Sequence, residues 1–338
     1  MIYLMRLFVS VLLISLVTCQ NRHLVEGVAV ETPYRIVLES RKWGAAAQVR
    51  TLARQELQKI AGHFSLYSET SEISRFNRHH GNFPASGPFL ELTSLSVDLA
   101  RRSNGALDPT IGPLLVIWGF GPQKPDRAPE LPEIRKTQEQ IGYRKIEIQG
   151  QTIVKKEAQI TLNLNALLDG YAAQKLADSL TRAGYHDFMV EIGGEIVVRR
   201  KEKQEPWKIG IEKPQHELED HVLHRTIYLH SAAVATSGDY RNFIKYGEKR
   251  ISHILDPRTG QPARTSAVSA TVVGPDCALA DGLATALLVL SPDDALALIE
   301  KTPGYEALLL LGESGGRLEE RMTGGMERYF EPPPAELR

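Results

Sequence analysis

The sequence predicts an α+β fold in which mixed, mostly antiparallel sheets pack against helices. Short segments with strand character outnumber the amphipathic helical segments, and hairpins alternate with helical connections. The phosphate-binding patterns G-x-G-x-x-G and G-x-x-x-x-G-K are absent from the sequence, which argues against a doubly wound parallel sheet with a Rossmann or P-loop site. A chain of 338 residues, 42% of them hydrophobic, is long enough to bury one large core or two lobes.

Residues 1–19 have the pattern of a bacterial export signal. The apolar run 7–18 is too short to cross about 30 Å of hydrocarbon at 1.5 Å per residue. It ends in Leu-Val-Thr-Cys, which resembles a lipobox and makes Cys19 the expected lipid-anchor site, on the periplasmic side of a membrane in the cell envelope. Plain secretion and a buried N-terminal element are the alternatives. With Cys19 lipidated, Cys277 has no disulfide partner.

Residues 20–338 are predicted to form a single domain without internal repeats. Apolar spacing of three and four residues predicts helices over 45–64, 89–103, 170–183, 278–290 and 292–301. Other short segments predict strands over 33–38, 145–148, 152–155, 159–162, 188–192, 195–199, 226–229, 232–236, 251–254, 267–273 and 306–311. Asn104-Gly105 is a helix stop, and Gly193-Gly194 predicts a tight hairpin. Prolines make 121–133 an exposed loop, and polar loops are expected over 65–82 and 213–225.

The formal net charge of −1, with 24% charged residues, gives no indication of a nucleic-acid partner. An anionic ligand would have to be held by local groups. Four segments that combine glycine with polar residues are the candidates. The first, 105–121, has an Asp-Pro-Thr turn and ends in Trp118-Gly-Phe120-Gly, where the rings could stack on a flat ligand. A structural turn with a core tryptophan is the alternative.

The second and third segments offer groups for phosphate. Segment 163–171 places two asparagines and an aspartate where a strand runs into a helix, so they either cap the helix or form a site for phosphate and metal. Segments 236–242 and 253–260 bring together a Ser-Gly-Asp turn, an arginine and His253. These supply hydrogen-bond donors, a cation and a group that titrates near neutrality.

The fourth segment holds Asp281 and Thr285, which lie four residues apart on a helix. Their oxygens therefore share one helix face. A carboxylate, a hydroxyl and backbone oxygens suit Mg²⁺, which needs few protein ligands when it also binds phosphate. The alternative is that Asp281 caps the start of a buried helix.

Together these segments resemble the ApbE family of flavin transferases, the FAD:protein FMN transferases. The resemblance covers about 32–311 in order, through the following stretches: Thr-Pro-Tyr-Arg-Ile at 32–36, Phe-Ser-Leu-Tyr-Ser-Glu-Thr-Ser-Glu-Ile-Ser-Arg-Phe-Asn at 64–77, Trp-Gly-Phe-Gly at 118–121, Gly-Gly at 193–194, Thr-Ser-Gly-Asp-Tyr-Arg at 236–241, His-Ile-Leu-Asp-Pro-Arg-Thr-Gly at 253–260, and the Asp281 and Thr285 pair. It implies the family fold of two closely associated lobes. It also implies secretion, often as a lipoprotein.

The resemblance implies a reaction and a site. Family members cleave FAD at its pyrophosphate, attach FMN through a phosphoester to a Ser or Thr of a partner protein, and release AMP. By resemblance, Mg²⁺ is coordinated by Asp281, Thr285 and the backbone carbonyl of Ala166. The residues implied to line the FAD site are Val30, Tyr67, Ala106, Leu107, Asp108, Asn163, Asp169 and His253. His253 is the candidate base beside the catalytic Asp281, with Asp239 and Asp256 as alternatives.

Three positions depart from the family pattern. Glu31 stands where a glycine is usual, Asn163 where many members have aspartate, and Asp169 where lysine or glutamate is common. These departures keep open flavin binding by a lipoprotein without catalysis. Hydrolysis of FAD to FMN and AMP also stays open, because it differs from transfer only in the acceptor.

Overall fold

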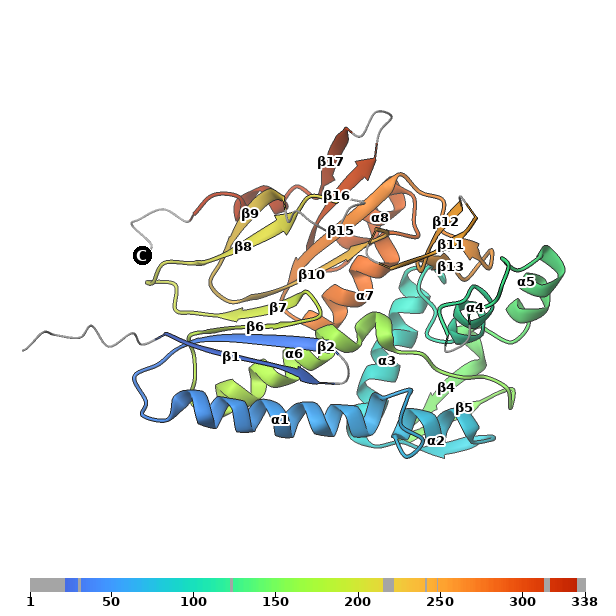
Figure 1. Cartoon of the computed structure of the whole chain (residues 1–338), viewed down its shortest axis with the longest axis horizontal. Helices are drawn as coiled ribbons and strands as arrows, with labels where there is room; N and C mark the ends of the chain where they lie inside the picture. Colours follow the sequence, from blue (N-terminus) through green and yellow to red (C-terminus); the bar gives the residue numbers. More distant parts are fainter. Residues whose placement is uncertain are drawn as a thin grey trace, which may run out of the picture.

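An eight-stranded antiparallel sheet runs through the protein in the order β1-β2-β6-β7-β10-β15-β16-β17 (Figure 1). Its strands are β1 (Arg22–Ala29), β2 (Thr32–Glu39), β6 (Phe188–Ile192), β7 (Glu195–Arg199), β10 (Ala232–Gly238), β15 (Ala267–Gly274), β16 (Glu306–Gly312) and β17 (Leu318–Met322). The computed structural model describes residues 22–29, 32–121, 124–214, 222–240, 242–247, 249–312 and 317–332. The predicted α+β class with antiparallel sheets is confirmed.

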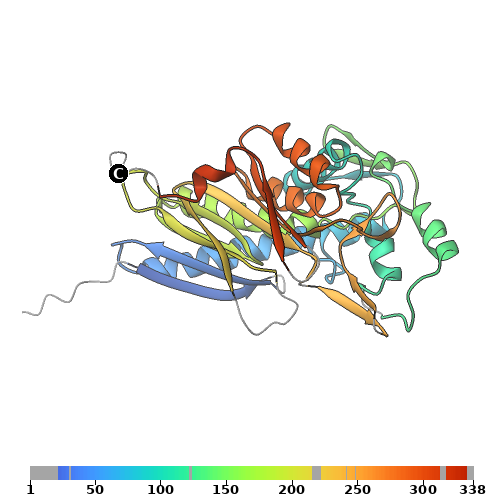
Figure 2. The same cartoon turned by 90° about the horizontal axis from the view of Figure 1, so that it is seen from above.

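Helices cover one face of this sheet (Figures 1 and 2). They are α1 (Ala45–Phe64), α3 (Gly87–Arg102), α6 (Asn165–Arg182), α7 (Cys277–Leu287) and α8 (Pro292–Glu300). The sheet turns alternate residues toward them, such as Ile36 of β2 and Leu309 of β16, which are both fully buried. This layer holds the larger hydrophobic core.

The opposite face of the sheet has a smaller core of its own. Val37, next to Ile36 in β2, and Leu308, next to Leu309 in β16, point to this face. They pack under the hairpin of β8 (Trp207–Glu212) and β9 (Leu223–Leu229) and under the 3₁₀ turn η2 (Met326–Tyr329). Burial on both faces explains why β15 and β16 are nearly continuous apolar runs.

A second lobe lies beyond the ends of α3 and α6 (Figure 1). Its helical segments are α2 (Glu72–Arg78), α4 (Gly112–Ile117), α5 (Leu131–Gln138) and η1 (Tyr143–Lys145). Its strands are β3 (Asn82–Pro84), β4 (Ile146–Gln149), β5 (Thr152–Lys155), β11 (Phe243–Tyr246), β12 (Lys249–Ser252), β13 (Leu255–Asp256) and β14 (Gln261–Pro262). A third apolar cluster, with Leu114, Trp118 and Ile134 at its centre, joins α4 and α5 to β13.

Several predicted elements match the structure to within a residue. Helix α1, strands β5, β6 and β7, and the two-residue turn at Gly193 and Gly194 are confirmed, and both turn glycines have positive φ. The helix stop is also confirmed, because Asn104 and Gly105 have φ of 51° and 77°. Within the described residues no helix is long and apolar enough to cross a membrane.

Other predicted elements were wrong. Residues 159–162 are not a strand, because the side chain of Asn77 takes the place of a partner strand: its Nδ2 donates to the Leu162 carbonyl at 2.9 Å and its Oδ1 accepts from the Leu162 N–H at 2.7 Å. The polar loop predicted over 65–82 contains α2, and α6 begins at Asn165 rather than at Gly170. Strands β1, β3, β8, β11, β13, β14 and β17 and helices α4 and α5 were not predicted, and α5 begins inside the loop predicted over 121–133.

Gly170 sits where α6 and α7 pack most tightly. A Cβ at this position would collide with the Cys277 carbonyl oxygen and lie 2.7 Å from Cβ of Asp281. Gly62, near the end of α1, has nothing within 4 Å of the same position. The close contact between α6 and α7 therefore requires glycine at position 170, whereas no contact requires it at position 62.

We predict opposite effects of alanine at these glycines. Gly170→Ala should lower the free energy of unfolding by about 1–3 kcal/mol because the two helices must move apart. Gly62→Ala should raise it by about 0.4–1 kcal/mol, because the extra methyl group meets no neighbour and restricts the unfolded chain. Urea denaturation of both variants measures the difference. Equal midpoints would contradict the close helix contact.

Candidate active site

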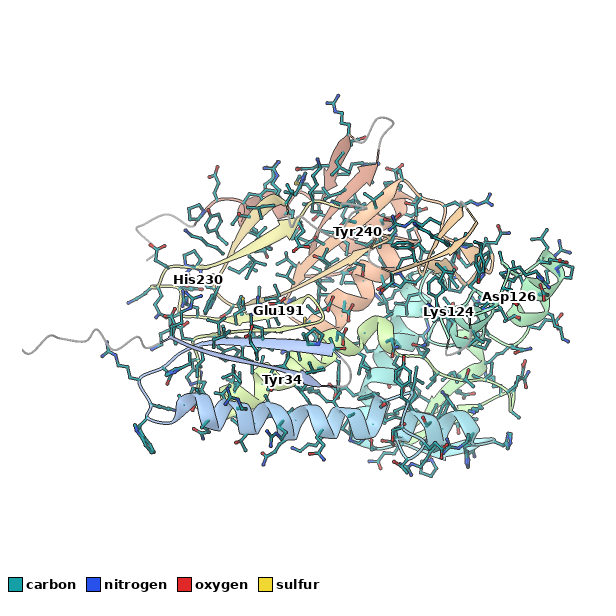
Figure 3. The ribbon with its side chains drawn as sticks, viewed as in Figure 1. Tyr34, Lys124, Asp126, Glu191, His230 and Tyr240 are labelled. Atoms are coloured by element: carbon teal, nitrogen blue, oxygen red, sulfur yellow. The ribbon has the colours of Figure 1, made fainter. Side chains whose placement is uncertain are left out.

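A cavity of about 700 Å³ opens between the two lobes. Ten of the predicted site residues line it: Tyr67, Ala106, Leu107, Asp108, Asn163, Ala166, Asp169, His253, Asp281 and Thr285. They come from segments far apart in the sequence, so the fold assembles them. Val30 and Glu31 lie outside the described residues, as does Cys19. Lys124, from the loop after α4, also lines the cavity (Figure 3).

Asp281 is not the cap of its helix. Helix α7 begins at Cys277, and its N-cap is Asp276, whose side chain accepts from the Leu279 N–H at 2.8 Å. Asp281 lies a full turn further along, with Oδ2 accepting from the Gly170 N–H at 3.0 Å. The capping alternative is therefore wrong for Asp281, whose carboxylate ties α7 to α6 and also lines the cavity.

The cavity floor is acidic. Burial raises the pKa of Asp281 well above its usual value, and the negative charges of Glu195 and Asp169 raise it further, against the hydrogen bond from Gly170. Burial also raises the pKa of Asp169, opposed by the Thr32 hydroxyl, which donates to it at 3.4 Å. A bound cation would relieve this accumulation of negative charge.

The residues present fit a hard cation such as Mg²⁺. Thr285 lies one turn beyond Asp281 on α7, and its Oγ1 is 3.2 Å from the Ser237 hydroxyl at the end of β10. Ala166 lies in the first turn of α6 and lines the same cavity. No cluster of three or more His, Cys, Asp or Glu side chains that could hold a metal occurs in the described part of the chain. Phosphate oxygens of a ligand would have to complete the coordination.

The start of α6 faces the cavity through Asn165, Ala166 and Leu167. Its N-cap is Leu164, whose side chain cannot accept a hydrogen bond, and the Leu167 N–H donates to the Leu164 carbonyl at 3.0 Å. Asn163 caps only locally, with Oδ1 accepting from the Asn165 N–H at 3.1 Å. Both interpretations of segment 163–171 therefore stay open, because Asn163 caps Asn165 while the helix start also lines the cavity.

His253 is held in one orientation against the cavity. Its Nδ1 lies 3.0 Å from the Asn242 carbonyl oxygen, which can only accept, so Nδ1 carries the proton and Nε2 is left as the acceptor. Burial lowers the pKa of His253, against the hydrogen bond to Asn242, so the ring is neutral at pH 7. The Phe120 ring packs edge-on at 6.2 Å between centroids.

The two alternative bases are placed less favourably. Asp239 and Asp256 are not among the described residues that line the cavity. Asp256 forms an ion pair with Arg258, with Oδ1 2.8 Å from Nε and Oδ2 3.0 Å from Nη2. Its carboxylate is therefore already engaged, and His253 is the better placed of the three.

In the first candidate segment, part of the polar pattern is structural. Trp118 is buried and donates from Nε1 to the Gly260 carbonyl at 2.8 Å, so the core alternative holds for this ring, while Phe120 lines the cavity. Asp108 accepts from the Thr110 N–H and hydroxyl at 2.8 and 2.6 Å, and from the Tyr143 N–H at 2.8 Å. It shapes the cavity wall by fixing this turn.

Sequence reasoning missed part of the cavity wall. Phe243 and Ile244 of β11 line it, in a hairpin that projects from the body of the protein (Figure 2). Glu195 lines it too, directly after the glycine turn. The apolar and aromatic residues Phe243, Ile244 and Tyr246 were the available signal, although a four-residue strand is too short to stand out.

A family model confirms the resemblance, since the model described as the ApbE family matches residues 30–309. The chain belongs to the ApbE family. An FAD:protein FMN transferase of Vibrio cholerae is 37% identical over 248 residues, which cover 72% of this chain and 74% of that protein. One from Haemophilus influenzae is 33% identical over 316 residues, covering 89% and 91%. The solved structure of the flavin transferase ApbE from Vibrio cholerae has a TM-score of 0.82 at 31% identity, covering 91% of this chain and 99% of that one.

We predict that Asp108→Asn destabilises this ApbE-family protein by about 1–3 kcal/mol, since an amide presents a donor to groups that themselves donate. Asp126→Asn is the control, because Asp126 lies exposed on the loop after α4 (Figure 3). Urea unfolding of the two variants gives the comparison. If Asp108→Asn behaves like the control, Asp108 does not hold the turn.

Proposed function

We propose that this protein transfers FMN from FAD to a Ser or Thr hydroxyl of a partner protein, in a Mg²⁺-dependent reaction that forms a phosphoester and releases AMP. The observation that carries the proposal is the convergence of ten predicted site residues on one cavity, with the Asp281 and Thr285 pair at its acidic floor. The relatives named FAD:protein FMN transferase support it.

Binding of FAD uses both sides of the cavity. The N-terminus of α6 faces the cavity through Asn165, Ala166 and Leu167, and its positive dipole end would favour the pyrophosphate. Tyr67, which is 73% exposed at the cavity edge, offers an aromatic face to a flat ring. Asp281, Thr285 and the Ala166 carbonyl would hold Mg²⁺, which when bound shields the charge of the pyrophosphate and of the departing AMP.

His253 is proposed as the base. The acceptor hydroxyl oxygen forms a bond to the FMN phosphorus while the phosphorus–oxygen bond to AMP breaks. The hydroxyl proton passes to Nε2 of His253, which is free to accept it because Nδ1 is bonded to Asn242. Attachment of the acceptor in line with the bond that breaks supplies the positioning.

Anchoring at the cell envelope is part of the proposal. A lipid on Cys19 would hold the protein on the periplasmic side of a membrane, where the acceptor protein would also have to be exposed. If Cys19 carries no lipid, the protein is secreted. The lipobox-like sequence supports the first of these.

The main test is a transfer reaction with FAD, Mg²⁺ and a threonine-containing acceptor peptide. We expect the peptide to gain the mass of one FMN, with AMP released in equal amount. Asp281→Asn should reduce the rate by about 10²-fold or more, because the charge that develops on the phosphates is no longer shielded. Asp98→Asn, exposed on α3, is the matched control.

The outcomes separate the competing functions. AMP and FMN with an unmodified peptide would indicate hydrolysis. FAD binding without any AMP would indicate a binding protein and would contradict the enzyme. Loss of FMN transfer in Asp98→Asn as well would show that the substitution effect is not specific to the cavity.

A pH prediction follows from His253. Because burial lowers its pKa, the ring stays neutral at pH 7 and down to below about 6.5, its ordinary value, and gains a proton only under more acidic conditions. His253→Asn should lower kcat at pH 7 by about 10²–10⁴-fold, and the ratio of wild-type to variant rate should fall toward one on acidification. Rate profiles at saturating FAD and Mg²⁺ measure this ratio. A ratio that does not change with pH would exclude His253 as the base.

A further inference from the structure

One end of the molecule carries a fully solvent-exposed tryptophan, Trp43. Trp43 is 101% exposed, whereas Trp118 and Trp207 are 6% and 5% exposed. It lies in the loop between β2 and α1. Nζ of Lys42 ties this loop to the end of α6 by donating to the carbonyls of Ala183 and Gly184 at 3.2 and 3.1 Å. A fully exposed indole is typical of a residue that inserts at a membrane–water interface.

The chain reaches this same end from its N-terminal segment. Arg22, the first residue of β1, pairs with Glu39, the last residue of β2. Nε2 of His23 lies 3.1 Å from the Ser40 carbonyl oxygen, in the loop that carries Trp43. Cys19 precedes Arg22 by three residues in the sequence, which span at most about 11 Å. Chain length therefore limits the distance of Cys19 from Arg22, at this end of the molecule, to about 11 Å.

The exposed charge at this end is mostly positive, although the chain has a net charge of −1. Two acidic residues here, Glu39 and Asp187, are both paired with Arg200, at 2.7 and 2.8 Å. The exposed basic residues are Arg22, Arg41, Lys42, Arg182, Lys201 and Lys203, beside the acidic residues Glu202 and Glu205. Such a surface attracts anionic phospholipid headgroups.

We infer that this end docks on an anionic phospholipid bilayer, with Trp43 in the interface; we call it the Trp43 end and define it by Trp43 and the six basic residues just named. A lipid on Cys19 would hold the protein at the membrane, and the Trp43 end would set its orientation on the bilayer surface. The inference uses the proposed lipid on Cys19 for orientation but does not depend on the transfer reaction.

Docking of the Trp43 end would fix the distance between the active-site cavity and the bilayer surface. Helix α1 has 20 residues and runs from the Trp43 loop toward Tyr67, a length of about 30 Å. Helix α6 has 18 residues and runs from the cavity to Arg182, about 27 Å. Figure 3 agrees with this separation: His230, in the turn between β9 and β10, and Lys124, which lines the cavity, lie far apart along the long axis. The cavity would stand roughly 30 Å from the bilayer.

The test reads Trp43 directly. The full chain, purified after export with its native leader, is reconstituted in phosphatidylglycerol vesicles with and without brominated acyl chains. Because the other two tryptophans are buried, subtraction of the Trp43→Phe spectrum isolates Trp43 emission. We expect this emission to shift to the blue and to be quenched by the brominated lipid. In phosphatidylcholine vesicles, or at high salt, the quenching should weaken.

Matched variants test the charge. Arg41→Glu should reduce the ratio of docked to undocked protein by about fivefold or more, since each basic residue near an anionic surface contributes that factor. Arg135→Glu, exposed on α5 at the other end, should leave it unchanged. Urea unfolding shows whether both variants stay folded.

The outcomes also separate the surface from the anchor. If Cys19 carries no lipid, the secreted chain is added to the same vesicles, and quenching of Trp43 still supports the docking surface. Equal Trp43 emission with brominated and unbrominated lipid overturns the inference. An equal loss of quenching in Arg41→Glu and Arg135→Glu overturns it too, because the effect would then not belong to this end.

Discussion

The active site depends on the contact between α6 and α7 at Gly170. Only a residue without a Cβ lets the Cys277 carbonyl and the Asp281 side chain approach so closely, and this approach lets the Asp281 carboxylate accept the Gly170 N–H while buried. That hydrogen bond fixes one carboxylate oxygen. It also sets the first turn of α6, with Ala166, against the face of α7 that carries Thr285. The proposed metal ligands therefore come from two helices whose distance is set by a missing side chain.

Buried negative charge beside that contact gives the site its chemistry. Asp169, Glu195 and Asp281 line one cavity, and two of them help raise the pKa of the third. A cation would stabilise the ionised form of these three carboxylates. We therefore expect binding of the metal and of phosphate to be coupled, because the metal neutralises the carboxylates and the phosphate oxygens complete its coordination.

The sequence predicted the parts of the fold that local patterns specify. Helix α1 shows a sustained apolar stripe, and the Gly193-Gly194 turn has the one residue type that readily takes positive φ. Prediction was wrong where a tertiary contact replaced local structure. Residues 159–162 have the composition of a strand, yet Asn77, far away in the sequence, satisfies the Leu162 backbone. Strand β1 was not predicted because it lies at the edge of the sheet. Its apolar residues Leu24 and Val28 are exposed, so the strand lacks a clear alternation of buried apolar and exposed polar residues.

The same division between local pattern and tertiary contact holds for the candidate site. The ten predicted residues that line the cavity belong to motifs with unusual composition, so the resemblance could identify them. The structure was needed to show what each of them contacts. Asp281 and Asp276 illustrate this point. Both are acids near the start of one helix, and only the Asp276 contact with Leu279 shows which of them is the cap. Once Asp276 fills that role, no local need of α7 explains a buried carboxylate one turn later. What remains is its bond to Gly170 and its place at the cavity floor. A buried acid beside two others destabilises the protein unless a ligand uses it, so its presence there is best explained by the site.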